Sequence, residues 1–165
     1  MKSIMLIAAA ANCVLLAGEL AARQPARTQT LFACTLENGK TARVTLQADR
    51  FTLRVGTARR ADLIVSGRPS DGNLFYESGP SGHDIAELRF ARGEHSYIVH
   101  SSGPTRVAGN GAGQSQLVIF HNGRIVAQHD CRRYAELKLW GPGVPEIPEN
   151  PSRSPSAWRD WDTPR

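Results

Sequence analysis

Apolar and polar residues alternate along short segments of this chain, which is the pattern of half-buried β-strands. In one such segment, Phe51, Leu53 and Val55 fall on one face, and Thr52 and Arg54 fall on the other. Similar segments recur at short intervals, and no helical periodicity accompanies them. We therefore expect strands over residues 31–36, 42–46, 51–55, 63–65, 74–76, 85–90, 96–100, 116–120 and 125–128.

Turn residues separate these segments and indicate how they connect. Asn38-Gly39 and Asn122-Gly123 each stand between two strand segments, as in tight β-hairpins, and Arg92-Gly93-Glu94 separates another pair. Mostly local connections predict an antiparallel meander that closes into a barrel or folds into a sandwich. We expect one all-β domain over residues 31–133, a small antiparallel barrel of about eight strands.

The first residues have the features of an export signal. Lys2 provides a positive charge, and the apolar stretch 4–16 is too short to span a bilayer comfortably. Small residues follow, so we expect a signal peptide over residues 1–22 and a short linker over residues 23–30. The residues before Cys13 depart from the Leu-small-small pattern of a lipoprotein. The mature chain is expected to be periplasmic or secreted, without a transmembrane segment.

Two cysteines bracket the folded part of the mature chain. Cys34 lies in the first predicted strand, and Cys131 follows the last one. An even number of cysteines in an oxidising compartment is normally paired, and neither has the CxxC or HxxxH spacing of a metal site. A Cys34–Cys131 disulfide would tie the first strand to the last and close the barrel at its seam. No metal and no cofactor are expected.

The formal charge of the chain is +5, and it comes chiefly from arginine. Such a balance suits an acidic partner, although a solvated basic surface is the simpler interpretation. Arg59-Arg60 and Arg132-Arg133 are pairs rather than runs, and no aromatic interleaving accompanies them. No nucleic-acid partner is expected.

The composition changes after Arg133. Prolines recur from Pro142 to Pro164, so residues 134–165 are predicted to be a Pro-rich, disordered tail. Trp158 and Trp161 are unusual in such a segment. They either dock on a partner, fold back on the domain, or have no role.

Catalytic motifs are missing from the sequence. There is no GxSxG elbow, HExxH helix, P-loop or Rossmann fingerprint. The Gly-rich segment 109–113 has no helix after it and is interpreted as a flexible loop. Glu87 and Asp130 are interpreted as ordinary outward-facing strand residues. The chain is therefore not expected to be an enzyme.

The histidines are scattered over predicted loops and strands. His95 and His121 fall at or next to turns, where solvated histidines are more common than metal ligands. An envelope hydrolase would need a triad built from residues such as His100 and Ser101. No local ligand pair or motif supports either chemistry.

The strand pattern resembles a known family. A cysteine near the mature N-terminus, an Asn-Gly-Lys turn and a closing Asn-Gly-Arg hairpin that ends in cysteine resemble the periplasmic and membrane-bound inhibitors of C-type lysozyme. The similarity spans most of residues 31–133. Phe90-Ala91-Arg92-Gly93 is similar to the family's aromatic-x-Lys-Gly element, with Arg92 in the lysine position. The family's Ser-Gly-x-x-Tyr element is matched only in part, by residues 71–75 or by residues 78–82.

The resemblance implies an exported binding protein whose loop enters the cleft of a lysozyme or another peptidoglycan-cleaving enzyme. Arg92 is the first choice for the contact with that enzyme's carboxylates. Alternatively, Arg92-Gly93 is simply a hairpin turn with a solvated arginine, and the protein is an envelope structural or interaction module that uses its basic surface or Trp-bearing tail. A monomer or weak dimer is expected. The residues expected to bind the partner are Arg92, Gly93, Phe90, Ser78 and Asp71.

Overall fold

A computed structural model describes residues 27–79, 85–103, 113–157 and 159. Each segment predicted to be a strand overlaps one of its strands. Among the residues described, helices of the length and hydrophobicity that crossing a bilayer requires are absent. The elements are β1 (Thr28–Thr35), β2 (Thr41–Gln47), β3 (Arg50–Gly56), β4 (Ala61–Gly67), the 3-10 helix η1 (Pro69–Asp71), β5 (Leu74–Ser78), β6 (Ile85–Arg92), β7 (His95–Ser102), β8 (Gln114–His121) and β9 (Arg124–Asp130).

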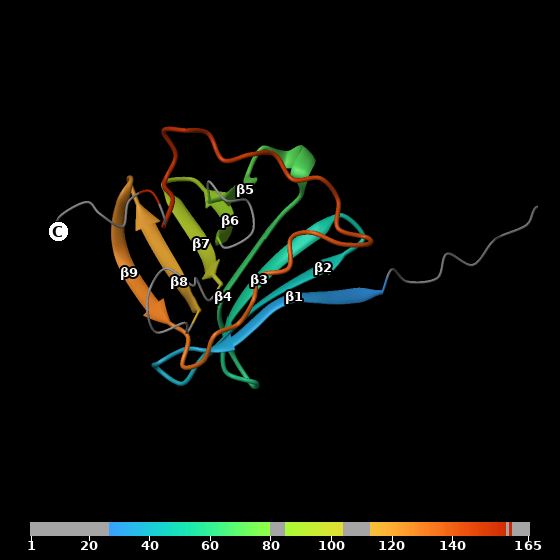
Figure 1. Cartoon of the computed structure of the whole chain (residues 1–165). Helices are drawn as coiled ribbons and strands as arrows, with labels where there is room; N and C mark the ends of the chain where they lie inside the picture. Colours follow the sequence, from blue (N-terminus) through green and yellow to red (C-terminus); the bar gives the residue numbers. More distant parts are fainter. Residues whose placement is uncertain (1–26, 80–84, 104–112, 158, 160–165) are drawn as a thin grey trace, which may run out of the picture.

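The strands form two antiparallel sheets, each a meander in chain order. The first sheet has the order β1-β2-β3-β4, and the second has the order β5-β6-β7-β8-β9. Figure 1 shows the two sheets facing each other. The all-β class and the antiparallel meander predicted from the sequence are confirmed.

Alternation places the apolar residues of both sheets between them. In β3, Phe51, Leu53 and Val55 are buried while Thr52 and Arg54 are partly exposed, as their period of two predicts. The main core takes side chains from both sheets, including Val44, Leu53, Leu74, Leu88, Phe90, Val99 and Leu117.

Glycines with positive φ occupy the hairpin turns. Gly39 (φ 80°), Gly93 (φ 57°) and Gly123 (φ 73°) adopt the left-handed conformation that other residues rarely tolerate. Asn122 also has positive φ (50°), so the Asn122-Gly123 pair has the conformation of a type I′ hairpin turn. The predicted turns at these sites are confirmed.

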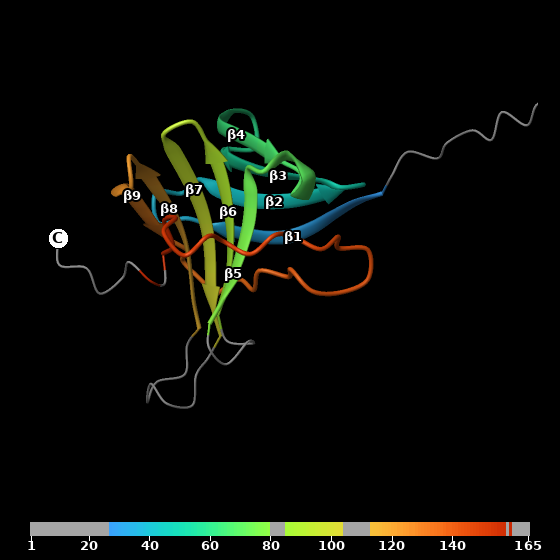
Figure 2. The same cartoon turned by 90° about the horizontal axis from the view of Figure 1, so that it is seen from above.

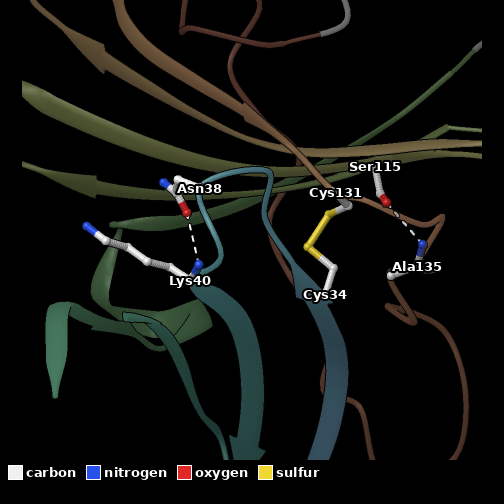
Figure 3. The surroundings of a disulfide bond; sticks show 6 residues. All are labelled: Cys34, Asn38, Lys40, Ser115, Cys131 and Ala135. Carbon is white, nitrogen blue, oxygen red and sulfur yellow. Dashed lines mark hydrogen bonds between the residues drawn. A yellow bond between two sulfur atoms is a disulfide. The ribbon is translucent and has the colours of Figure 1, made fainter. Parts of the chain in front are cut away.

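The predicted disulfide is confirmed. Cys34 in β1 is bonded to Cys131, with a Cα–Cα distance of 5.7 Å and a sequence separation of 97 (Figure 3). Next to it, Leu36 forms an isolated antiparallel bridge with Cys131, and the Arg132 amide donates to the Thr35 carbonyl at 2.8 Å. The bond therefore ties the first sheet to the end of the second. In the chain-entropy model, a loop of this length contributes about 4.7 kcal/mol.

The closed barrel is not confirmed. Within the described residues the strands form two separate sheets, and β4 and β5 do not pair although they are consecutive. The short helix η1 and the left-handed Gly72 (φ 66°) lie between them and carry the chain from one sheet to the other. The disulfide links the sheets at β1 and β9, but no ladder joins the sheets at β4 and β5.

The segment after β9 differs from the predicted disordered tail. It packs on the domain up to Ala157, and its apolar residues Leu137, Leu139 and Ile147 belong to the main core. The Lys138 amide donates to the Leu31 carbonyl at 3.0 Å, so the chain first runs back beside β1 (Figure 1). Prolines remove backbone donors but leave carbonyls and intervening side chains free to pack, which is why an irregular segment can still be well buried.

Several expectations lie outside the described residues. These are the signal peptide 1–22, Cys13, most of the Gly-rich segment 109–113, and both Trp158 and Trp161. The predicted linker 23–30 is described only in part, and its end belongs to β1, which begins at Thr28.

Candidate functional site

The predicted contact residues Arg92 and Gly93 lie at a hairpin tip. Arg92 is the exposed last residue of β6, and Gly93 occupies the turn that leads into β7. Phe90, by contrast, is buried in the main core at 1% exposure. Phe90 therefore supports the strand that presents Arg92, and its own side chain is not on the surface.

The other two predicted contact residues lie at opposite ends of β5. Asp71 is exposed in η1, next to the start of β5, where the Ala91 amide donates to the Asn73 carbonyl at 2.8 Å. This places Asp71 at the same end of the sheet as Arg92. Ser78 pairs with Ala86 at the other end. The structure therefore places Asp71 at the same end of the sheet as the tip and Ser78 at the other end.

Two neighbouring hairpins bring four basic or titratable residues into one cross-strand row. Arg92 pairs with His95, His95 pairs with His121, and His121 pairs with Arg124, across β6, β7, β8 and β9. Residues that pair directly across antiparallel strands share a face of the sheet. We call Arg92, His95, His121 and Arg124 the basic row.

Contacts between the two turns hold the basic row in place. The imidazole rings of His95 and His121 are stacked, with centroids 4.4 Å apart and planes at 17°. Tyr97 continues the stack, its ring centroid 6.1 Å from that of His95. The Asn122 amide donates to the Glu94 carbonyl at 2.9 Å, and His121 Nε2 lies 3.0 Å from Glu94 Oε2.

The charged residues at the tip differ in whether they form an ion pair. Glu94 is engaged by His121, whereas neither Arg92 nor Arg124 forms an ion pair with any residue that the structure describes. Both arginines are exposed. A guanidinium has five N–H donors in a planar fork that matches a carboxylate. The exposed guanidinium groups at the tip are therefore available to pair with carboxylates.

Glu87 corrects the interpretation of an ordinary outward-facing residue. Its side chain does point away from the main core, but it is buried at 1% exposure. Glu87 Oε1 lies 2.9 Å from His100 Nδ1, and Glu87 Oε2 accepts from Ser156 Oγ at 2.9 Å and from the Ala157 amide at 3.1 Å. Asp130 is exposed, as predicted.

The contacts described for this cluster differ from those of a catalytic triad. Ser156 bonds to the carboxylate, whereas a nucleophilic serine would bond to the imidazole. The pair considered from the sequence, His100 and Ser101, does not come together either, because consecutive strand residues point to opposite faces. Ser101 Oγ instead accepts from the Leu137 amide at 3.1 Å.

Two hollows lie away from the tip. One, of about 220 Å³, is beside the disulfide and is lined mainly by polar residues such as Gln116, Gln128 and Asp130. Tyr134 also lines it, and burial, with Glu136 nearby, raises the pKa of the Tyr134 hydroxyl. The other, of about 290 Å³, lies between Tyr76 and the loop that carries Trp140. In the described part of the chain, no three His, Cys, Asp or Glu side chains cluster as metal ligands would.

Comparison of the chain with protein-family models, curated proteins and solved structures finds no match. The site therefore has to be argued from its geometry. Sequence reasoning identified each turn separately but missed the basic row. The signal was present in the sequence, since Arg92-Gly93-Glu94-His95 and His121-Asn122-Gly123-Arg124 form the turns of two hairpins. Hairpins of one meander that turn at the same end of the sheet bring such residues side by side.

Proposed function

We propose that this protein is an exported binding protein that inserts its hairpin tip into an acidic cleft, with a peptidoglycan-cleaving enzyme of the lysozyme type as the target. The observation that carries the proposal is the basic row, in which Arg92 and Arg124 are exposed on either side of stacked His95 and His121. The disulfide is compatible with an oxidising compartment. Closure of the two sheets as a small barrel belongs to the same proposal and is supported by the disulfide at the β1–β9 seam.

The chemistry of the target explains why arginines would inhibit it. Glycosidases of this kind work with two carboxyl groups in a cleft. A guanidinium binds a carboxylate through two parallel, charge-assisted hydrogen bonds. Two arginines at one tip suit two carboxylates, and the enzyme's own substrate is then excluded from the cleft.

Two acidic residues lie near this contact. Glu94 is already engaged by His121, which reduces its repulsion of an incoming carboxylate. Asp71, in η1 at the same end of the sheet, has no such ion pair among the described residues and would oppose binding. Asp71→Asn is therefore expected to strengthen binding modestly.

The test is a lysozyme activity assay with the oxidised full-length protein at several salt concentrations. We expect inhibition that weakens as salt rises, because the contact is between exposed charges. Arg92→Glu and Arg124→Glu should each abolish it. Arg43→Glu makes the same charge change on the exposed side of β2 and should leave inhibition intact.

Inhibition that is equally sensitive to all three arginine variants would mean that net charge, and not the tip, is responsible. Absence of inhibition at micromolar protein would reject this target and favour an interaction module without inhibitory activity.

A further inference from the structure

The end of the described chain lies along the edge of the second sheet. The Tyr76 amide in β5 donates to the Pro148 carbonyl at 2.9 Å, and the Asn150 amide donates back to the Tyr76 carbonyl at 2.6 Å. These bonds form a parallel bridge between Tyr76 and Glu149. Figure 2 shows this red segment crossing β5 and β6. We call residues 148–157 and 159 the strap.

An ion pair fixes the far end of the strap. Arg159 donates to Glu77 from Nε at 2.7 Å and from Nη2 at 3.0 Å, a bidentate contact with a carboxylate on β5. Asn150 Nδ2 donates to the same Glu77 at 3.0 Å, and Arg89 Nη1 donates to Asn150 Oδ1 at 2.9 Å. The side chains of Arg159 and Glu77 are 27% and 12% exposed, so this pair is only weakly solvated.

The remaining contacts of the strap are with Glu87 and a small apolar patch. Ser156 Oγ and the Ala157 amide both donate to Glu87 Oε2. Ala157 also packs on Ile98, Val118 and Phe120, which form a cluster separate from the main core.

The strap contributes little to the main core and contacts the sheet in the way that a bound peptide does. The apolar residues that anchor the preceding segment, Leu137, Leu139 and Ile147, all lie before it. What the strap itself contributes is hydrogen bonds to a strand edge, hydrogen bonds to the partly buried Glu77 and the buried Glu87, and one small apolar residue. Edge bonds for affinity and side-chain contacts for specificity are the features of extended-peptide recognition by a sheet.

We propose that the outer face of β5–β7, with Glu77 and Glu87 as its anchors, is a peptide-binding site that the strap occupies in cis. Its partner is an extended peptide of another chain that carries a serine and, three residues later, an arginine, as Ser156 and Arg159 do in the strap. Glu77 binds the arginine, Glu87 binds the serine hydroxyl and the next amide, and Tyr76 supplies the strand edge. This site is distinct from the hairpin tip and does not rest on the function proposed for it.

The test uses the full chain and a fluorescent peptide with the sequence of residues 146–165. In the wild type the tethered strap competes at a high effective concentration, so we expect the peptide to bind weakly. In the Arg159→Glu chain the strap loses its ion pair, and the peptide should bind about tenfold more tightly or better. Fluorescence anisotropy measures both affinities.

Matched peptides locate the contact. A peptide with Arg159→Glu should fail to bind, whereas one with Arg153→Glu should bind normally, because Arg153 is exposed. A chain with Glu77→Arg should reject the wild-type peptide and accept the Arg159→Glu peptide. Equal binding to all chains, or binding indifferent to Arg159 in the peptide, would overturn the proposal. A wild type that exchanges straps as a dimer, seen by light scattering, would support the site with a second copy as its occupant.

Amide hydrogen exchange on the wild type tests the proposal without any variant. If the strap is a removable ligand, the amides of Asn150 and Ala157 should exchange about a hundredfold faster than those of Leu88 and Val99 in the core of the sheet. If the strap amides were protected from exchange as strongly as those of the core strands, the strap would be an integral part of the folded domain, and the proposal would be overturned.

Discussion

Two glutamate–histidine pairs in the same sheet have almost the same N···O distance and very different surroundings. Glu87 Oε1 lies 2.9 Å from His100 Nδ1, and Glu94 Oε2 lies 3.0 Å from His121 Nε2. In the first pair the histidine and glutamate side chains are 1% and 2% exposed, and in the second they are 41% and 69% exposed. Distance alone would rank the pairs as equal. Burial determines how much each contributes, because water competes for one pair and is excluded from the other.

The difference also separates the roles of the two regions. Arg92 and Arg124 are exposed at the tip. The contact between His121 and Glu94 links its two turns. Beneath the strap, Glu87 accepts from Ser156 Oγ and the Ala157 amide and lies 2.9 Å from His100 Nδ1, so removing its carboxylate breaks several buried contacts at once. Under the two proposals above, binding at the tip costs the fold little, whereas binding at the face under the strap is coupled to stability.

The largest expected effect is from Glu87→Ala. This change removes the acceptor of Ser156 Oγ and of the Ala157 amide, and the partner of His100 Nδ1, in a buried place, and it should lower the free energy of unfolding by about 3 kcal/mol or more. Glu94→Ala removes an acceptor at the same distance but at the surface, and should cost less than about 1 kcal/mol. Urea denaturation of the two variants measures the difference. Equal losses would show that the two pairs are energetically alike and that burial does not set their contribution.

An intermediate effect is expected from Arg159→Ala, because the Glu77–Arg159 pair is partly buried. Loss of its bidentate contact should reduce stability by about 1–2 kcal/mol. Arg159→Lys keeps the charge but cannot form the planar fork, so it should recover only part of that loss. Thermal and urea unfolding of both variants provide the measurement. A lysine variant as stable as the wild type would mean that charge alone holds the strap.

The tip has its own backbone constraint, at Gly93. Gly93 has φ 57°, and a Cβ added there would meet nothing within 4 Å. Gly93→Ala should therefore cost about 1 kcal/mol through backbone strain alone. The same substitution at Gly113 would place a Cβ 2.7 Å from the Tyr134 ring, so it should cost more through a clash. Urea midpoints of the two variants distinguish strain from crowding, and the reverse order would contradict this explanation.

The sequence predicted which face of the sheet each strand residue occupies better than it predicted what covers that face. Alternation placed Glu87 on the face opposite to Ala86 and Leu88, and it does lie there. The expectation of solvent on that face was wrong, because the cover comes from Ser156, a residue 69 positions later in the chain. Local patterns report which face a residue occupies, but they carry no information about a distant segment that packs on that face.

The packing of the segment after β9 was missed for a related reason. A Pro-rich composition predicts the absence of helices and strands, and residues 134–157 indeed have almost none. Absence of regular structure is not disorder, since Leu137, Leu139 and Ile147 are buried. The basic row was missed because each turn was recognised alone. Its residues come together only once β7 and β8 are known to be neighbours.

The smallest effect extends the comparison to a fourth ion pair, between Lys40, just before β2, and Asp62 in β4, whose charged atoms lie 2.9 Å apart. Hydrogen bonding from Lys40 lowers the pKa of the Asp62 carboxyl below its ordinary value of 3.8. A lowered pKa in the folded state means that the carboxylate adds stability above the unfolded pKa, and that this contribution is lost as pH falls through the folded pKa. The wild type should therefore be slightly more stable than Asp62→Asn at neutral pH, and the two should converge between about pH 5 and pH 2. Urea midpoints of the wild type and Asp62→Asn across that range measure the convergence. A gap that persists below pH 2 would assign the effect of Asp62 to packing or hydrogen bonding that does not depend on its charge.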